Sequence, residues 1–160
     1  MTILKNIFSF ILPVMVLILV PLSIEKDWTV QFGWNFYASL ILVIAGLSVM
    51  AITISSFIQV GKGTLAPWSP TKRLVIVGPY RYVRNPMIMG VLTVLLGESL
   101  SVLSLPVLKW AGLFFLINTI YFIFSEEPGL EDRFGDDYRK YKKHVSRWIP
   151  RITPFDLSKK

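Results

Sequence analysis

The side chains best suited to chemistry lie in two short clusters on either side of a long apolar stretch. The first cluster, residues 78–86, holds two tyrosines, two arginines and an asparagine: Tyr80, Arg81, Tyr82, Arg84 and Asn85. The second cluster is the acidic pair at 126–127. Guanidinium and amide groups donate hydrogen bonds to anions, whereas carboxylates bind cations or accept protons. Pro86 suits the first turn of a helix, whose free N–H groups would also face an anion.

The composition restricts where such clusters can lie. The chain has 160 residues, of which 53% are hydrophobic and 17% charged, and its mean hydropathy is +0.57. Soluble domains carry about 25% charged residues. The chain has no cysteine and a single histidine, His144, which argues against disulfides and against a metal site. These numbers disfavour an ordinary soluble enzyme, a disordered tail and a secreted disulfide scaffold, and they predict an integral membrane protein.

Four apolar runs are candidates to cross a membrane, which takes about 20 residues. They are residues 7–24, 36–58, 86–105 and 107–125. The first run could instead be a cleaved signal peptide. It is longer than the apolar core of such a peptide, however, and it ends without a small-residue cleavage site. We therefore expect four retained transmembrane helices.

The last two runs are divided only at Pro106 and predict a tight antiparallel hairpin. This hairpin would bring the two polar clusters to the same membrane face. In the second run, Gly46 and Ser48 are small enough to let a neighbouring helix approach closely. Two interpretations of Glu98, in the third run, stay open. Its carboxylate is turned into the bundle or a wet cavity, or it lies near the turn and is solvated.

The net charge of +7 and the pI of about 9.8 would suggest a nucleic-acid partner in a soluble chain. Here the linker between the second and third runs has basic residues and no acid: Lys62, Lys72, Arg73, Arg81 and Arg84. Cytoplasmic loops carry such an excess because Lys and Arg resist translocation. We therefore expect the linker and both termini on the cytoplasmic side, with membrane lipids rather than nucleic acid as partners.

The segment after the last run is expected to form a cytoplasmic helical cap. Its apolar and aromatic residues recur at helical steps of three and four: Leu130, Phe134, Tyr138, Tyr141 and Val145. Gly135, followed by two aspartates, is expected to divide this segment into two helices, with an aspartate capping the second. Residues 74–77 are too short to span and are expected to be buried. The predicted fold is all-α, with a two-span N-terminal segment (1–58) and a core unit (59–160).

The clusters and the tail form one longer pattern. Residues 78–87 read GPYRYVRNPM, an apolar hairpin follows, and then come the acidic pair, an FG-x-x-Y-x-x-Y sequence starting at Phe134, and Arg147 and Pro150. This pattern, over roughly residues 61–150, resembles the isoprenylcysteine carboxyl methyltransferase and phospholipid methyltransferase superfamily. The resemblance implies transfer of a methyl group from S-adenosylmethionine to a lipophilic acceptor, carried out by the core unit.

The resemblance also implies which residues hold the cofactor at the cytoplasmic face. On the adenosine side these are Lys72, Arg73, Leu74, Val75 and Tyr80. Near the methionine part they are Asn85, Pro86, Met87 and Ile88, with Glu126 binding a cofactor amine or hydroxyl. The catalytic candidates are Arg84 and Glu127. An amino-acid zwitterion needs an acid for its ammonium group and N–H donors for its carboxylate, which agrees with this set.

Three positions depart from the superfamily's pattern. Asn85 replaces the usual histidine, as it also tends to do in phospholipid N-methyltransferases, and Ile88 replaces the usual tyrosine. Phe122 stands where prenylcysteine enzymes place an arginine for the substrate carboxylate, which argues against a prenylcysteine acceptor. A carboxylate acceptor would need no base, whereas an amine would pass a proton to a group such as Glu127 or Glu98.

Two other classes of function stay open. Sterol reductases share a related C-terminal membrane architecture and use a nicotinamide cofactor, although they normally have more spans than this chain can hold. The chain could also be a non-catalytic membrane scaffold that kept the fold. Binding of S-adenosylmethionine or of NADPH would separate these classes.

Overall fold

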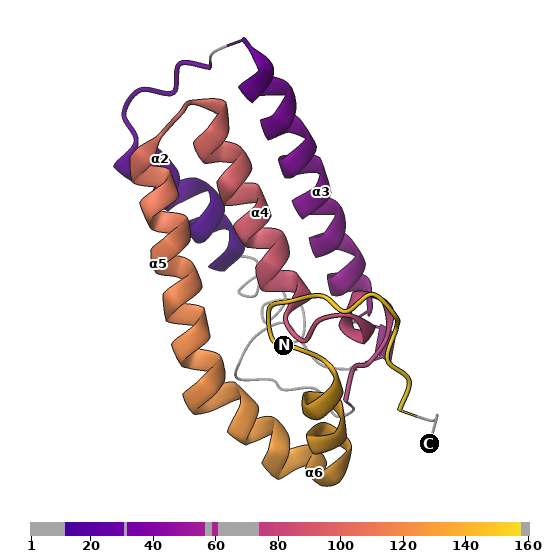
Figure 1. The fold of residues 1–160 in the computed structure, drawn as a ribbon. Helices are drawn as coiled ribbons and strands as arrows, with labels where there is room; N and C mark the ends of the chain where they lie inside the picture. The colour runs from indigo at the N-terminus through magenta and orange to yellow at the C-terminus, as the bar shows by residue number, and fades with distance from the viewer. Residues whose placement is uncertain (1–11, 31, 57–58, 61–73, 158–160) are drawn as a thin grey trace.

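The computed structural model describes residues 12–30, 32–56, 59–60 and 74–157, and every regular element in these ranges is a helix (Figure 1). In chain order the elements are η1 (Met15–Leu19), α2 (Val20–Ile24), α3 (Trp34–Ser56), η3 (Gly78–Arg81), α4 (Pro86–Ser101), α5 (Leu105–Tyr121), η4 (Phe122–Glu126) and α6 (Glu127–His144). η1 and η4 are π-helical, and η3 is a 3₁₀-helix. The all-α prediction is confirmed.

Two of the described helices have the length and hydropathy of a membrane span. α3 has 23 residues, and α5 continues through η4 into α6 as a 40-residue helical segment, Leu105–His144, that is kinked at Gly135. The other two apolar helices, Leu12–Ile24 and α4, are shorter, and residues 7–11 of the first expected run lie outside the described residues. The number of four spans therefore stays a prediction.

α4 and α5 run antiparallel, as the expected hairpin does (Figure 1). The break between them lies at 102–104 and not at Pro106. Ser104 caps α5, because its hydroxyl oxygen accepts a hydrogen bond from the backbone N–H of Val107 (3.2 Å). Pro106 instead lies in the first turn of α5, where its missing N–H leaves no hydrogen bond unmade.

Glu98 lies in the last turn of α4, close to this connection. Its side chain is half-buried, and its Oε2 atom is buried with no hydrogen-bond partner among the described residues. One carboxylate oxygen is therefore buried although the residue lies near the turn, a combination that neither interpretation of the sequence described.

α3 and α4 are in close contact through small residues. On α3 the buried residues Ser39, Gly46 and Thr53 recur every seven positions and form one stripe. A Cβ atom on Gly46 would lie 2.6 Å from the carbonyl oxygen of Gly90 on α4. The expected close approach at Gly46 is confirmed, whereas Ser48 is exposed and its hydroxyl donates to Ile44 of its own helix.

Replacing Gly46 with alanine is expected to destabilise the bundle by about 2–3 kcal/mol, because the new methyl group meets backbone that cannot move aside. The matched control is Gly112→Ala on α5, where a Cβ atom would meet nothing within 4 Å. Thermal unfolding of both variants in detergent checks this prediction. Equal midpoints for the two variants would contradict the close contact.

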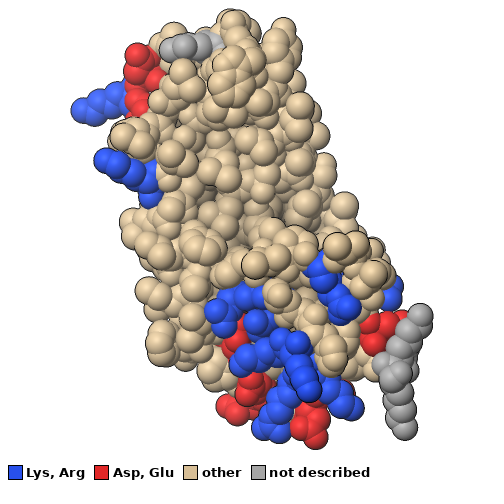
Figure 2. Space-filling view, in the orientation of Figure 1, with Lys and Arg blue, Asp and Glu red and all other residues tan. Residues whose placement is uncertain are grey.

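The charged side chains lie at the two ends of the bundle. Figure 2 shows most of them at the end formed by α6, a few at the opposite end, and an uncharged belt between them. α5, for example, has Lys109 near its start and no other charge along its length. Charged groups are costly inside the hydrocarbon layer, so an uncharged belt of this kind fits a membrane protein.

Candidate functional site

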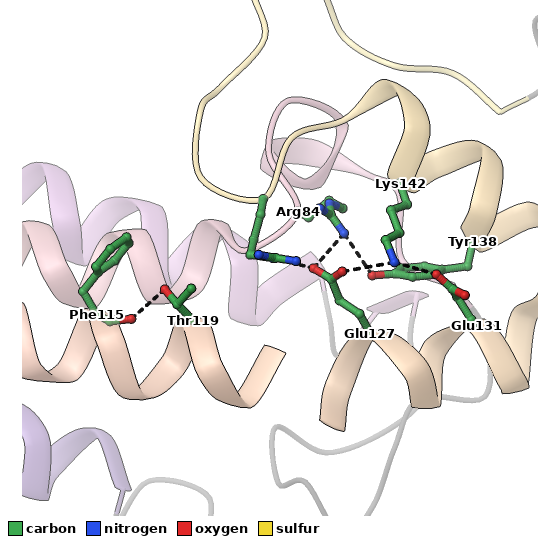
Figure 3. Close-up of polar contacts among 8 residues, drawn as sticks. Arg84, Phe115, Thr119, Glu127, Glu131, Tyr138 and Lys142 are labelled. Atoms are coloured by element: carbon green, nitrogen blue, oxygen red, sulfur yellow. Dashed lines mark hydrogen bonds and ion pairs between the residues drawn. The ribbon is translucent and has the colours of Figure 1, made fainter. Parts of the chain in front are cut away.

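The carboxylate of Glu127 is the centre of the largest polar cluster in the described part of the chain. It lies in the first turn of α6, and Glu127 is only 3% exposed. Its Oε1 atom accepts from Arg84 (2.8 Å), which precedes α4, and from Arg147 (2.6 Å), which follows α6. The expected meeting of the two clusters is thus observed for Arg84 and Glu127 (Figure 3).

Three more residues of α6 complete this arrangement (Figure 3). The Lys142 ammonium lies 3.4 Å from Glu127 Oε2 and 2.6 Å from Glu131 Oε1. Arg84 also donates to the hydroxyl of Tyr138 (3.3 Å). We call these six residues the Glu127 cluster: Arg84, Glu127, Glu131, Tyr138, Lys142 and Arg147.

A kink at Gly135 brings the far half of α6 back to its start. Gly135 has φ +53° and ψ −127°, which lie outside the helical region. Glu127 and Lys142 are fifteen residues apart, or about 22 Å along a straight helix, yet their side chains are in contact. The expected division of this segment at Gly135 is therefore observed, and the Glu127 cluster depends on it.

Replacing Gly135 with alanine is expected to cost about 1–3 kcal/mol, because residues with a Cβ atom rarely adopt this backbone conformation. A Cβ atom would meet no neighbour within 4 Å there, so the cost comes from the backbone alone. Gly129→Ala is the matched control, since Gly129 lies in the same helix, has no positive φ and is equally free of neighbours. The midpoints of thermal unfolding check this prediction, which is wrong if Gly135→Ala is as stable as Gly129→Ala.

The ion pairs determine the protonation of Glu127. Burial alone would raise the pKa of this carboxyl, but the hydrogen bond from Arg147 and the charge of Arg84 outweigh it and hold the pKa below its ordinary value. A carboxylate held ionised in this way is a weak proton acceptor. The geometry therefore favours a positioning role for Glu127 over the role of a base.

Two tyrosines, the half-buried Tyr80 and the buried Tyr141, stay protonated beside the Glu127 cluster. Burial raises the pKa of Tyr80, and the charge of Glu126 raises it further. Burial also raises the pKa of Tyr141, whose hydroxyl donates to the backbone oxygen of Tyr80 (2.6 Å). Tyr141 therefore fixes η3 to α6.

The chain after α6 lies along the residues before α4. The backbone N–H of Arg84 donates to Ser146 (3.0 Å), and that of Arg151 donates to Tyr82 (3.0 Å). The backbone N–H of Phe155 donates to Arg81 (2.9 Å). Three elements, the pre-helix segment, α6 and the C-terminal segment, are thus joined at one end of the bundle (Figure 1).

The other expected cofactor residues lie in different surroundings. Val75 is buried, and Leu74 packs on the cluster formed by Tyr138, Tyr141 and Val145, as expected for 74–77. Pro86 is fully buried at the start of α4 and Met87 is half-buried. Ile88 packs against the apolar core of the helices. Lys72 and Arg73 lie outside the described residues.

Unsatisfied polar groups lie beside the Glu127 cluster. Arg84 Nε and Asn85 Nδ2 are buried and have no hydrogen-bond partner among the described residues. Glu126 accepts a hydrogen bond from the Tyr121 hydroxyl (3.1 Å), and it forms no ion pair within the described ranges. These groups offer two donors to an anion and one acid to a cation.

Sequence reasoning missed part of the Glu127 cluster. Tyr138 and Arg147 were part of the motif, but the contact of Tyr138 with Arg84 and that of Arg147 with Glu127 were not predicted. Lys142 was not singled out at all. Helical spacing could not identify it, because its contact with Glu127 depends on the kink at Gly135.

A sequence model of the phospholipid methyltransferase family matches residues 34–137, which include α3, α4, α5 and the start of α6. The chain belongs to this family. The family is one of methyltransferases, and the apolar helices fit a membrane protein. The expected superfamily is thereby confirmed.

Two relatives are similar to parts of the chain. Methanethiol S-methyltransferase 1 of Bradyrhizobium diazoefficiens is 31% identical over 127 residues, or 76% of this chain and 40% of that protein. A protein of Haemophilus influenzae described as uncharacterized is 37% identical over 70 residues, or 42% of this chain and 98% of that protein. The chain thus spans 40% of the length of the methyltransferase relative. No solved structure matches it.

Proposed function

We propose that this protein transfers a methyl group from S-adenosylmethionine to a lipophilic acceptor at the cytoplasmic face of a membrane. The observation that carries the proposal is the set of buried donors without partners, Arg84 Nε and Asn85 Nδ2, at the bundle end that also holds Glu126. The amino-acid part of this cofactor is a zwitterion, whose carboxylate suits the donors and whose ammonium suits the acid.

The other cofactor-binding residues are assigned to the adenosine side or to the methionine side of S-adenosylmethionine. We assign Lys72, Arg73, Leu74, Val75 and Tyr80 to the adenosine side, and Pro86, Met87 and Ile88 to the methionine side. The first turn of α4 has free N–H groups that favour an anion. When bound, S-adenosylmethionine supplies a methyl group that its sulfonium already makes electrophilic, so the chain's residues mainly position the reactants.

Whether the reaction needs a base depends on the acceptor. A carboxylate or a thiolate is already charged and needs no base, whereas an amine must lose a proton. Glu127 is a weak base in its ion pairs, and Glu98 is twelve residues, or about 18 Å, along α4 from Pro86. We therefore propose that Glu127 positions Arg84, whose Nε atom is one of the two cofactor donors, and that an acceptor that ionises readily is preferred.

Two observations bear on the acceptor class. The ring of Phe122 contacts Trp148 (5.9 Å), so this position offers an apolar surface and no cation for a prenylcysteine carboxylate. The relative from Bradyrhizobium is named for methanethiol, a thiol. We propose a lipid-like or thiol acceptor and place the core unit at 59–160, with four spans and both termini on the cytoplasmic side.

Membranes containing the protein, incubated with methyl-labelled S-adenosylmethionine, test the proposal. The acceptors are a phosphatidylethanolamine, an alkanethiol and a prenylcysteine. We expect label in one of the first two, lost in Arg84→Ala and kept in Arg139→Ala, which removes an exposed arginine paired with Asp136. Label in none of the three, or equal label in Arg84→Ala, would contradict the proposal.

A further inference from the structure

A row of aromatic side chains leads along α5 and η4 to Glu126. The ring centroids of Phe115 and Trp148 lie 5.1 Å apart, and those of Trp148 and Phe122 lie 5.9 Å apart. Phe122 contacts Tyr121 (5.8 Å), whose hydroxyl donates to Glu126 (3.1 Å). We call Phe115, Trp148, Phe122 and Tyr121 the aromatic row.

Trp148 carries a buried donor that the chain does not satisfy. Its Nε1 atom is buried and has no hydrogen-bond partner among the described residues. The indole N–H of Trp110 donates to Val16 (3.0 Å), and that of Trp28 donates to Glu25 (3.1 Å). Buried indole N–H groups usually find a partner, since an unpaired one costs about 1–3 kcal/mol. Trp148 Nε1 is therefore a buried donor whose hydrogen bond no described residue accepts.

The backbone at one end of the aromatic row is π-helical. Phe122–Glu126 is a π-helix between α5 and α6, and π-helical turns within α-helices are frequent at functional sites. Trp148 lies two residues after Ser146, whose backbone oxygen accepts from the N–H of Arg84 (3.0 Å). The same contacts that assemble the Glu127 cluster therefore place the Trp148 ring against α5.

The aromatic row also lies where the apolar part of the long helix gives way to its charged part. Phe115, Phe122 and Trp148 are half-buried. α5 is apolar apart from Lys109, and α6 begins with an acid. An amphiphile aligned with the membrane would thus place its chain along α5 and its head group near Glu126.

We propose that the aromatic row binds the methyl acceptor and that Trp148 Nε1 donates a hydrogen bond to an oxygen atom of its head group. The ligand class is an amphiphile with one or more apolar chains and a phosphate, ester or carboxylate oxygen near the methylated group. This inference rests on the proposed function, because Glu126 marks the cofactor end of the aromatic row.

The test compares two probes on protein saturated with S-adenosylhomocysteine. Lysophosphatidylethanolamine carries a chain, an amine and oxygen atoms, whereas an alkylamine of equal chain length lacks the oxygens. We expect Trp148→Phe to weaken binding of the phospholipid about five- to tenfold, the effect of one hydrogen bond. Binding of the alkylamine should not change. The matched control is Trp110→Phe, which removes an indole that already has a partner and should leave both affinities unchanged.

A second measurement does not depend on the variant's folding. In protein labelled with ¹⁵N in its tryptophans, the indole resonance of Trp148 should move when the phospholipid is added and stay in place with the alkylamine. The inference would be overturned if the phospholipid did not bind or if this resonance did not shift. It would also be overturned if Trp148→Phe weakened the binding of both probes equally. Binding of S-adenosylhomocysteine is measured separately, so its absence would identify a failure of the proposed function instead.

Discussion

Replacing Glu127 with alanine is expected to lower the free energy of unfolding by about 3 kcal/mol, because it leaves the cations of the cluster without their shared counter-charge. Arg84 and Glu127 have side chains that are only 10% and 4% exposed, so water cannot replace the lost contact fully. For a chain of this size the change corresponds to a fall of about 6–12 °C in Tm. Thermal unfolding in detergent measures it.

Glu131→Ala is the matched control for this variant. It removes an acid from the same helix that contacts Lys142, a residue with a side chain that is 39% exposed. Exposed pairs contribute about 1 kcal/mol or less, so the control should stay close to the parent. Equal losses in the two variants would contradict a central role for Glu127.

Acidification provides a second measure of the same ion pairs. The folded pKa of Glu127 lies below its ordinary value, so the stability contributed by its ionisation is fully present above the unfolded pKa of about 4.3. It is lost as the pH falls through the folded pKa. Glu127→Gln, which cannot titrate, should therefore lose less stability than the parent on acidification, and an identical acid profile would count against the assignment.

Replacing Glu126 with alanine is expected to weaken binding of S-adenosylhomocysteine about 10- to 100-fold, the loss of one charge-assisted hydrogen bond. Glu126 is half-buried and has no ion pair within the described ranges, so the change in folding stability should stay within about 0.5 kcal/mol. Titration calorimetry measures the affinity, and thermal unfolding measures the stability.

Asp137→Asn is the matched control, because it removes one exposed negative charge from α6. Its affinity for S-adenosylhomocysteine should equal that of the parent. If Glu126→Ala also binds as the parent does, Glu126 does not contact the cofactor. Together with Glu127→Ala, these two variants test whether the neighbouring acids have different roles, Glu126 in binding the cofactor and Glu127 in stabilising the fold.

The parts of the fold that depend on local sequence could be predicted. Long apolar runs predicted α3, α4 and α5, because each run has about the length that a membrane span needs. Gly46 predicted a close helix contact, and Gly135 predicted a break in α6, because both effects follow from a missing Cβ atom. The predicted close contact at Ser48 was wrong, because a small residue does not by itself determine which face of a helix meets its neighbour.

The candidate site could be predicted only in part, because its contacts join distant segments. The short connection between α4 and α5 was enough to place Arg84 near Glu127. The contact of Lys142 with Glu127 depends on the backbone angles at Gly135. The π-helix at Phe122–Glu126 carries no recognisable sequence signal, yet it determines how the acidic pair follows α5.

The most direct test of the central claim is titration calorimetry of the detergent-solubilised protein with S-adenosylhomocysteine and, separately, with NADPH. The account predicts micromolar binding of S-adenosylhomocysteine, a free energy of about −8 kcal/mol, and no saturable binding of NADPH. Saturable binding of NADPH, with no binding of S-adenosylhomocysteine by the folded protein, would contradict it.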